Sequence, residues 1–284
     1  MTARLAIHSD VVARTPDVLH RLIAAGVDVE FVGGEAGTAE GAADALQGVR
    51  DSRLDLALVG IRALRGSAAD DLTTVAVLPR EEFRDVLVSI DGSRASLAQL
   101  PAGAVVGLAG QRRLAFLRAH RPDLEAVLLD PGVLADAARV PVGIDAMIIS
   151  AIDARRAGLS DAVVEALEPK SWLPEPGQGA LALVARHPIA EATALDHLPT
   201  RTALRTELAL LDALDSDDGA PLGCLAQPSG RWIRLWAAAA SPDGRRLVRS
   251  DLTGPLDEPE ALGDAVARQL VERGIGLVLE SARK

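Results

Sequence analysis

Short apolar runs alternate with amphipathic, helix-like stretches from the start of this chain, and this alternation limits the possible folds most strongly. "RLAIHS" (4–9) is typical of a strand. "TPDVLHRLIAAG" follows it, with Thr15 suited to cap a helix and Pro16 suited to its first turn. "VDVEFVGG" and "LDLALVG" then flank a second helical stretch, "AEGAADALQGV". This β-α-β-α-β order predicts a mostly parallel sheet with helices on both faces.

The same pattern restarts after "PREEFRDVLVS" and changes character near Thr200. In the middle of the chain, the strand-like "AVVGLAG" precedes the helical "QRRLAFLRAH", and "EAVLLD" and "IDAMIISAI" follow as strands. The last region begins with a helix, "RTALRTELALLDALD", and ends with another, "EPEALGDAVARQLVERG". Between them, apolar strands flank "SPDG" (241–244), which predicts a β-hairpin.

Composition excludes several classes of protein. A length of 284 residues is too great for one ordinary core and suits two or three domains. The net charge of −10 argues against broad binding to nucleic acid or to a membrane surface. One cysteine allows neither an intrachain disulfide nor a cysteine cluster for a metal, and His20, His120, His187 and His197 show no metal-ligand spacing. Without a signal peptide or a long apolar run, we expect a soluble cytoplasmic protein.

One local pattern suggests an anion site. In "VVGLAGQRRLAFL" (105–117), a strand enters a glycine loop and then a helix that carries Arg112 and Arg113 in its first turn. Free backbone amides and the helix dipole favour an anion there, and guanidinium groups bind carboxylates well. We expect these groups and Arg156, from "DARRAGL", to converge on one point. Taken alone, an adjacent arginine pair is more often merely solvated.

Several stretches together resemble the porphobilinogen deaminase (hydroxymethylbilane synthase) family. The matching segments are "LPAGAVVGLAGQRRLAFLRAHRPDLEAV", "DAMIISAIDARRAGL", "PEPGQGALALVAR", "PLGCLAQ" and "AAAASPDGRRLVRSDLTGP", and their order and spacing match as well. The resemblance implies an α/β protein of three domains. Two periplasmic-binding-protein-like α/β domains, residues 1–83 with 174–196 and residues 84–173, would flank a cleft. A small C-terminal α/β domain, residues 197–284, would carry the family's cofactor loop.

The resemblance also implies a dipyrromethane cofactor, bound as a thioether to a cysteine, but the sequence departs from this pattern. Alignment on Pro221 and Gly223 places Asp218 where the family has that cysteine. The single cysteine, Cys224, lies six residues later, where we expect a small core or edge residue. We therefore expect that the chain carries no cofactor and no covalent attachment. In the alternative, a rearrangement of the cofactor loop would bring Cys224 into position to carry dipyrromethane.

The family's catalytic aspartate, which stabilises cationic pyrrole intermediates, corresponds to Ala63. Arg62 replaces the preceding lysine, and Arg112, Arg113 and Arg156 match family arginines that bind carboxylate groups. Other family arginines correspond to His8, to Asp130 in "LDPG", and to a position near Asp136. The two aspartates place negative charge where a substrate carboxylate would lie, which discriminates against a polyanion.

These departures lead to one main hypothesis, which has two forms, and to one alternative. The chain would be a diverged, monomeric member that makes no hydroxymethylbilane and binds a small anion, a carboxylate or pyrrole-like acid, through Arg62, Arg112, Arg113 and Arg156. It would be either a repurposed enzyme, with His8, Asp130 or Asp218 as acid–base groups, or a binding or regulatory module without catalysis. The alternative is an active porphobilinogen deaminase that uses Cys224.

Overall fold

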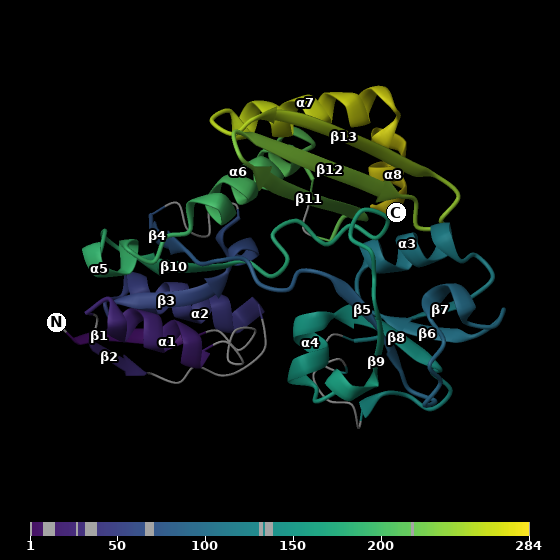
Figure 1. The fold of residues 1–284 in the computed structure, drawn as a ribbon, viewed down its shortest axis with the longest axis horizontal. Coiled ribbons are helices and arrows are strands. Elements are labelled where there is room, and N and C mark those ends of the chain that lie inside the picture. Colours follow the sequence, from purple (N-terminus) through teal and green to yellow (C-terminus); the bar gives the residue numbers. More distant parts are fainter. Residues whose placement is uncertain are drawn as a thin grey trace. The chain divides into compact units, whose positions relative to one another are not determined.

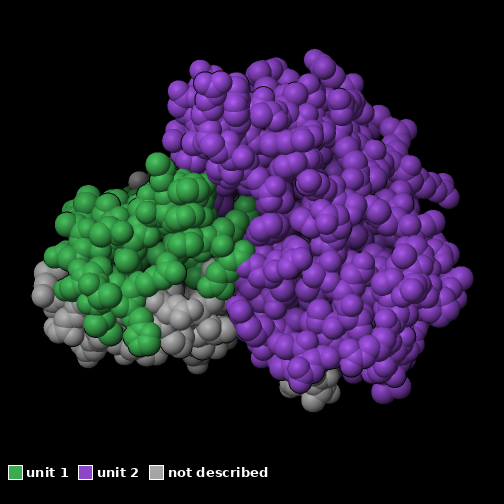
Figure 2. Space-filling view, in the orientation of Figure 1, with its two compact units in different colours: residues 1–81, 179–201 green, residues 82–178, 202–284 purple. Residues whose placement is uncertain are grey.

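The computed structural model describes residues 2–7, 15–26, 28–31, 39–65, 71–130, 133, 139–216 and 219–283. The chain forms two compact units, and both are discontinuous (Figure 2). Unit 1 contains residues 1–81 and 179–201, and unit 2 contains residues 82–178 and 202–284. The chain therefore passes between the units at 81/82, 178/179 and 201/202.

Unit 1 is built on a five-stranded sheet with the order β2-β1-β3-β10-β4 (Figure 1). Its strands are β1 (Thr2–Ile7), β2 (Asp28–Phe31), β3 (Leu56–Gly60), β4 (Thr73–Val77) and β10 (Leu181–Ala185). Its helices are α1 (Thr15–Ala24), α2 (Ala39–Arg50), the short η2 (Ile61–Leu64), α5 (Ala190–Thr193) and the beginning of α6 (Leu198–Ala213). The first three strands are parallel, as the alternating sequence predicts, whereas β10 is antiparallel to β3 and β4.

Unit 2 contains a second five-stranded sheet of matching topology, β7-β6-β8-β5-β9. Its strands are β5 (Asp85–Ser89), β6 (Val105–Leu108), β7 (Glu125–Leu128), β8 (Ala146–Ser150) and β9 (Val163–Ala166). Strand β6 is parallel to β7 and β8, and β5 is antiparallel to β8 and β9. In each sheet, the antiparallel inner strand follows soon after the chain has crossed from the other unit. The helices here are α3 (Gln111–His120) and α4 (Ala151–Arg156), with short 3-10 turns η4 (Leu97–Gln99) and η6 (Ser160–Ala162).

The C-terminal part of unit 2 is an antiparallel sheet covered by helices (Figure 1). Its strands β11 (Leu222–Ser229), β12 (Trp232–Ala240) and β13 (Leu247–Pro255) pair in chain order. The predicted hairpin at 241–244 is confirmed, because it joins β12 to β13. Apolar side chains on one sheet face form a core with α6, α7 (Pro259–Glu272) and α8 (Ile275–Ala282).

The opposite face of this C-terminal sheet packs against α3. Leu225, Ala238 and Ala240 join the core around Phe116 and Trp172. The hairpin turn lies against the last turn of α3, where Arg118 Nη1 donates a hydrogen bond to the Pro242 carbonyl at 2.7 Å. The two sheets of unit 2 therefore share a continuous interior. The expected division of residues 82–284 into two domains, and the exact boundaries predicted for all three, stay predictions.

Candidate functional site

Charged side chains gather at one edge of the β7-β6-β8-β5-β9 sheet. Asp85 opens β5 and lies opposite Ser150, the last residue of β8. The parallel strands β6 and β8 end at this edge, and α3 and α4 begin there. Ligands of open α/β sheets bind outside the carboxyl ends of the parallel strands, so this edge is the candidate site within unit 2.

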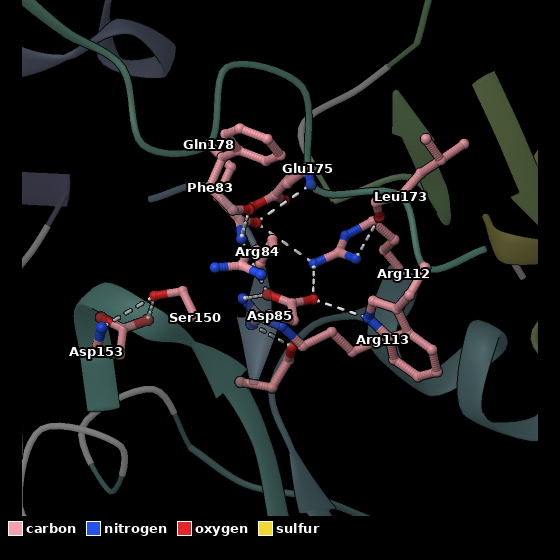
Figure 3. A network of polar contacts seen from close by, with 12 residues as sticks. Phe83, Arg84, Asp85, Arg112, Arg113, Ser150, Asp153, Leu173, Glu175 and Gln178 are labelled. Carbon is pink, nitrogen blue, oxygen red and sulfur yellow. Dashed lines mark hydrogen bonds and ion pairs between the residues drawn. The ribbon is translucent and has the colours of Figure 1, made fainter. Parts of the chain in front are cut away.

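Arg112 is a buried structural residue. Its side chain is only 4 % exposed, and its Nη2 lies 2.7 Å from Asp85 Oδ2 (Figure 3). Its Nη1 donates to the Leu173 carbonyl at 2.8 Å. These contacts hold the guanidinium inside the protein. Arg112 therefore contributes positive charge to the edge of the sheet, but it presents little surface to a ligand.

Arg113 binds the other oxygen of the same carboxylate. Its Nη2 lies 3.0 Å from Asp85 Oδ1, and its Nη1 donates to the Ala109 carbonyl at 3.1 Å. Its buried Nε donates to no group among the described residues. The predicted convergence of the two guanidinium groups is thus present, but the group at their meeting point is the Asp85 carboxylate. A buried donor without an acceptor costs about 1–3 kcal/mol, so Nε favours the approach of an oxygen.

Asp85 is fully buried and accepts two further side-chain hydrogen bonds. Trp172 Nε1 donates to Oδ2 at 3.0 Å, and Gln178 Nε2 donates to Oδ1 at 3.0 Å. Burial by itself raises the pKa of Asp85, but the charges and hydrogen bonds of Arg112 and Arg113 outweigh it and hold that pKa well below its ordinary value. The carboxylate is therefore charged throughout the physiological pH range.

The ion pair with Asp85 also changes the pKa of Arg113, in the opposite direction. Burial lowers the pKa of Arg113, whereas the Asp85 charge and hydrogen bond raise it, and the net pKa lies above its ordinary value. The charges of Glu175 and Asp153 raise it further. Arg113 thus remains charged, and negative groups surround it on more than one side.

Gln178 connects this cluster to the segments where the chain changes units. Its Nε2 also donates to the Phe83 carbonyl at 2.8 Å, and its Oε1 accepts from the Glu175 backbone amide at 3.2 Å (Figure 3). Residues 82 and 178 are the terminal residues of unit 2 at two of its crossings. One side chain therefore ties both crossing segments to the charged cluster.

Arg156 lies at the end of α4 and forms its own ion pair. Its Nη1 is 3.5 Å from Asp153 Oδ1, and its side chain is 22 % exposed. Asp153 is also held by Ser150, which caps α4 and donates from its hydroxyl to Asp153 Oδ2 at 2.6 Å. Arg156 is thus more accessible than Arg112 and Arg113, and a carboxylate accompanies it.

The other predicted site residues lie in unit 1, beyond β7 or outside the described residues. Arg62 and Ala63 lie on η2, directly after β3, in unit 1. Asp130 is exposed beyond β7, and the ion pairs of Arg112 and Arg113 are made with Asp85. His8, Asp136 and Asp218 lie outside the described residues. Their acid–base and ligand-binding roles stay predictions.

Cys224 is fully buried in β11. It belongs to the core between the C-terminal sheet and its helices, as expected for a small core residue, and its backbone amide donates to the Pro174 carbonyl at 3.0 Å. A thiol in this position is inaccessible to a reagent or to a pyrrole while the sheet remains folded.

Sequence reasoning overlooked three members of the cluster: Asp85, Trp172 and Gln178. Asp85 carried a detectable signal, because a carboxylate at the start of the buried run "DVLV" requires a cation or several donors nearby. Trp172 and Gln178 carried none, since they come from a segment without regular structure whose path is set by tertiary packing.

The described part of the chain has neither a candidate metal cluster nor a helix that could span a membrane. Three or more histidine, cysteine, aspartate or glutamate side chains nowhere come together there in a way suited to a metal ion. Likewise, none of its helices combines the length and apolarity that crossing a bilayer requires.

Comparison with known proteins gives a consistent family assignment. Residues 44–194 match the model of a family described as "Porphobilinogen deaminase, dipyromethane cofactor binding domain". The chain is 36 % identical over 242 residues to the porphobilinogen deaminase of Desulforudis audaxviator, covering 84 % of this chain and 78 % of that protein. It is 35 % identical over 233 residues to the enzyme of Chromobacterium violaceum, covering 80 % and 75 %.

A third relative and a solved structure complete the comparison. The porphobilinogen deaminase of Mycobacteroides abscessus is 35 % identical over 242 residues, which cover 80 % of this chain and 78 % of that protein. A periplasmic substrate-binding protein of an ABC transporter from Coxiella burnetii matches with a TM-score of 0.46 and 16 % identity, over 68 % of this chain and 90 % of that one.

The family match corrects one prediction from the sequence. We expected no cofactor, whereas the matched domain is the one that binds the dipyrromethane cofactor. That expectation, which relied on Asp218 in the place of the attachment cysteine, is wrong. Asp218 lies outside the matched residues 44–194, so a substitution there does not decide whether this domain binds the cofactor.

Proposed function

Because the chain belongs to the porphobilinogen deaminase family, we propose that it binds a small pyrrole carboxylate noncovalently at the sheet edge formed by Arg112, Arg113 and Arg156, and that it does not assemble hydroxymethylbilane. The observation that carries this proposal is the Asp85 cluster, which combines two arginines with one aspartate. The pyrrole class comes from the family, whose matched domain binds a dipyrromethane.

The charges of the cluster suit one carboxylate better than several. Asp85 neutralises one of the guanidinium groups of Arg112 and Arg113, and Asp153 accompanies Arg156. Nearby, Glu82 and Arg84 neutralise each other at 2.5 Å. Glu175 adds a further negative charge that acts on Arg113, so the cluster holds no surplus of cations. Arg113 Nε has no acceptor among the described residues. This donor offers a bonding position to one carboxylate oxygen, whereas each additional carboxylate would lack a cation.

Two features favour noncovalent binding without turnover. Cys224 is the only cysteine of the chain and is fully buried, so a thioether on its sulfur would require β11 to leave the core. Ala63, at the position of the family's catalytic aspartate, has no group that could stabilise a cationic pyrrole. The remaining residues are suited to hold an acid and give no support for the condensation chemistry.

The test is calorimetric titration of the purified chain with porphobilinogen, together with Arg113→Gln and a control, Arg245→Gln. The Arg245 side chain is 86 % exposed, and its ion pair with Asp243 is long, at 3.8 Å. Loss of a charge-assisted hydrogen bond costs about 1.5–3 kcal/mol, so Arg113→Gln should weaken binding by roughly 10- to 100-fold. Arg245→Gln should bind like the wild type.

Mass spectrometry and an activity assay separate the alternatives. Any pyrrole seen on the protein under native conditions should dissociate under denaturing conditions, and porphobilinogen should not be consumed above background. An adduct that survives denaturation and disappears in Cys224→Ala would instead support the active enzyme. Equal affinities of the wild type and Arg113→Gln would remove Arg113 from the site.

A further inference from the structure

A chain of contacts connects strand β13 of the C-terminal sheet to the Asp85 cluster. Its first member is Arg249, whose Nη2 lies 3.0 Å from His120 Nε2. The same guanidinium donates to the carbonyls of Ser171, at 2.9 Å, and Lys170, at 3.3 Å. Arg249 therefore holds both the last residue of α3 and the backbone immediately before Trp172.

The hydrogen bonds of His120 define its role in this chain. Its Nδ1 lies 2.8 Å from the Phe116 carbonyl, which only accepts hydrogen bonds, so Nδ1 carries the proton. A guanidinium only donates hydrogen bonds, so Nε2 is the acceptor in the contact with Arg249. The two contacts fix the orientation of the imidazole ring. No carboxylate contacts this ring among the described residues; the charged side chain bonded to it is that of Arg249.

The His120 ring transmits this orientation to Trp172 by packing. The two ring centroids are 5.7 Å apart, and Phe116 meets Trp172 edge-on with centroids 5.9 Å apart. Trp172 is only 3 % exposed, so the indole has little room to move. Its Nε1 is thereby aimed at Asp85 Oδ2, the oxygen that also binds Arg112.

We propose that Arg249 is a positioning residue for the anion site, acting through His120 and Trp172 on the Asp85 carboxylate. This inference rests on the proposed function for its ligand, but its structural part is independent of any ligand. Arg249 touches none of the site arginines. Its loss would leave the Ser171 carbonyl and His120 Nε2 without their donor and would release the Trp172 indole. The hydrogen bonds of the two Asp85 carboxylate oxygens with Arg112 and Arg113 would then change.

The indole N–H signal of Trp172 in a two-dimensional nitrogen–proton NMR spectrum tests the structural part without ligand. The chain has three tryptophans, and the signal of Trp172 is assigned by its disappearance in Trp172→Phe. Arg249→Met should shift this signal and accelerate its hydrogen exchange at least tenfold, whereas Arg249→Lys, which keeps a donor, should restore part of the shift. His120→Leu should reproduce the effect of Arg249→Met from the other side of the contact.

Arg234→Met is the matched control, because Arg234 lies on the neighbouring strand and pairs with the exposed Asp251. It should leave the Trp172 signal unchanged. Porphobilinogen affinity should fall about three- to tenfold in Arg249→Met and stay constant in Arg234→Met. Variants that lose stability but keep the Trp172 signal in place would overturn the positioning role. A shifted signal in a protein that binds no porphobilinogen would leave the positioning of Asp85 intact and refute the proposed function alone.

Discussion

The Asp85 carboxylate and the Arg113 guanidinium form a 3.0 Å ion pair in which the aspartate is completely buried. Removing a carboxylate from water costs several kcal/mol, and this cost is offset only where charges and hydrogen bonds surround it. Asp85 meets the condition with donors from Arg112, Arg113, Trp172 and Gln178. These donors link α3 and residues 172–178 to β5. The pair is therefore structural as well as a candidate ligand contact.

Asp85→Asn should destabilise unit 2 strongly. The substitution leaves two buried guanidinium groups without their counter-charge, and breaking such a pair typically costs about 3–5 kcal/mol. Tryptophan fluorescence during urea unfolding measures this directly, because Trp172, Trp232 and Trp236 all lie in unit 2. Asp251→Asn is the control: its pair with Arg234 is about half exposed and should change the unfolding free energy by less than about 1 kcal/mol. Equal changes in unfolding free energy would mean that the buried Asp85 ion pairs stabilise unit 2 no more than the exposed pair of Asp251 does.

The lowered pKa of Asp85 should appear as a pH dependence of stability. A carboxyl group whose pKa is lower in the folded state stabilises the fold above its unfolded pKa of about 3.9, and this stabilisation is lost as the pH falls below that value. Between about pH 3.9 and pH 2, the unfolding free energy of the wild type should fall more steeply than that of Asp85→Asn, by up to about 1.4 kcal/mol per pH unit. Other carboxylates titrate in both proteins and cancel in the difference. Parallel curves would show that Asp85 titrates normally.

Most of the fold could be predicted from hydrophobic periodicity. The expected helix "QRRLAFLRAH" is α3 without any shift, and the "SPDG" turn joins two strands as expected. What periodicity could not supply is the direction of β5 and β10. Both are buried apolar runs, and a continuous run of this kind fits a parallel or an antiparallel neighbour equally well. Their direction follows from the chain crossing between units, a long-range property.

The candidate site was predictable only where a local pattern encodes it. The glycine loop before Arg112 and Arg113 indicated a helix start at the right residue, because Gly110 has a φ of 87° that other residues avoid. The group that the arginines meet was not predictable in this way. Asp85 is 27 residues from Arg112 in the sequence, and Trp172 is 87 residues from Asp85. Only tertiary packing brings such distant residues together.

The burial of Cys224 should make its thiol unreactive in the folded protein. With no exposure to solvent, the thiol should react with an aromatic disulfide reagent at least a hundredfold more slowly in the native chain than in urea. Absorbance of the released thiolate measures both rates. Cys224→Ala removes a small buried group and should cost about 1–2 kcal/mol. A native rate close to that of the unfolded chain would place the sulfur at the surface and contradict its burial in β11.

The hairpin turn between β12 and β13 should tolerate no side chain at Gly244. Its φ is 74°, and a Cβ there would lie 2.4 Å from the Arg118 carbonyl carbon and 2.6 Å from the Ala119 nitrogen, both backbone atoms of α3.

Gly230, in the turn between β11 and β12, is the matched control: its φ is 60°, but a Cβ would meet nothing within 4 Å. Gly230→Ala should cost only the left-handed backbone, about 1–2 kcal/mol. Gly244→Ala adds the overlap with α3, about 1–3 kcal/mol more. Urea unfolding followed by tryptophan fluorescence compares the two. Because Arg249, which contacts His120, lies five residues after Gly244, Gly244→Ala should also disturb the Trp172 indole signal, whereas Gly230→Ala should not. Equal losses of stability with an unchanged indole signal would show that the hairpin does not press on α3.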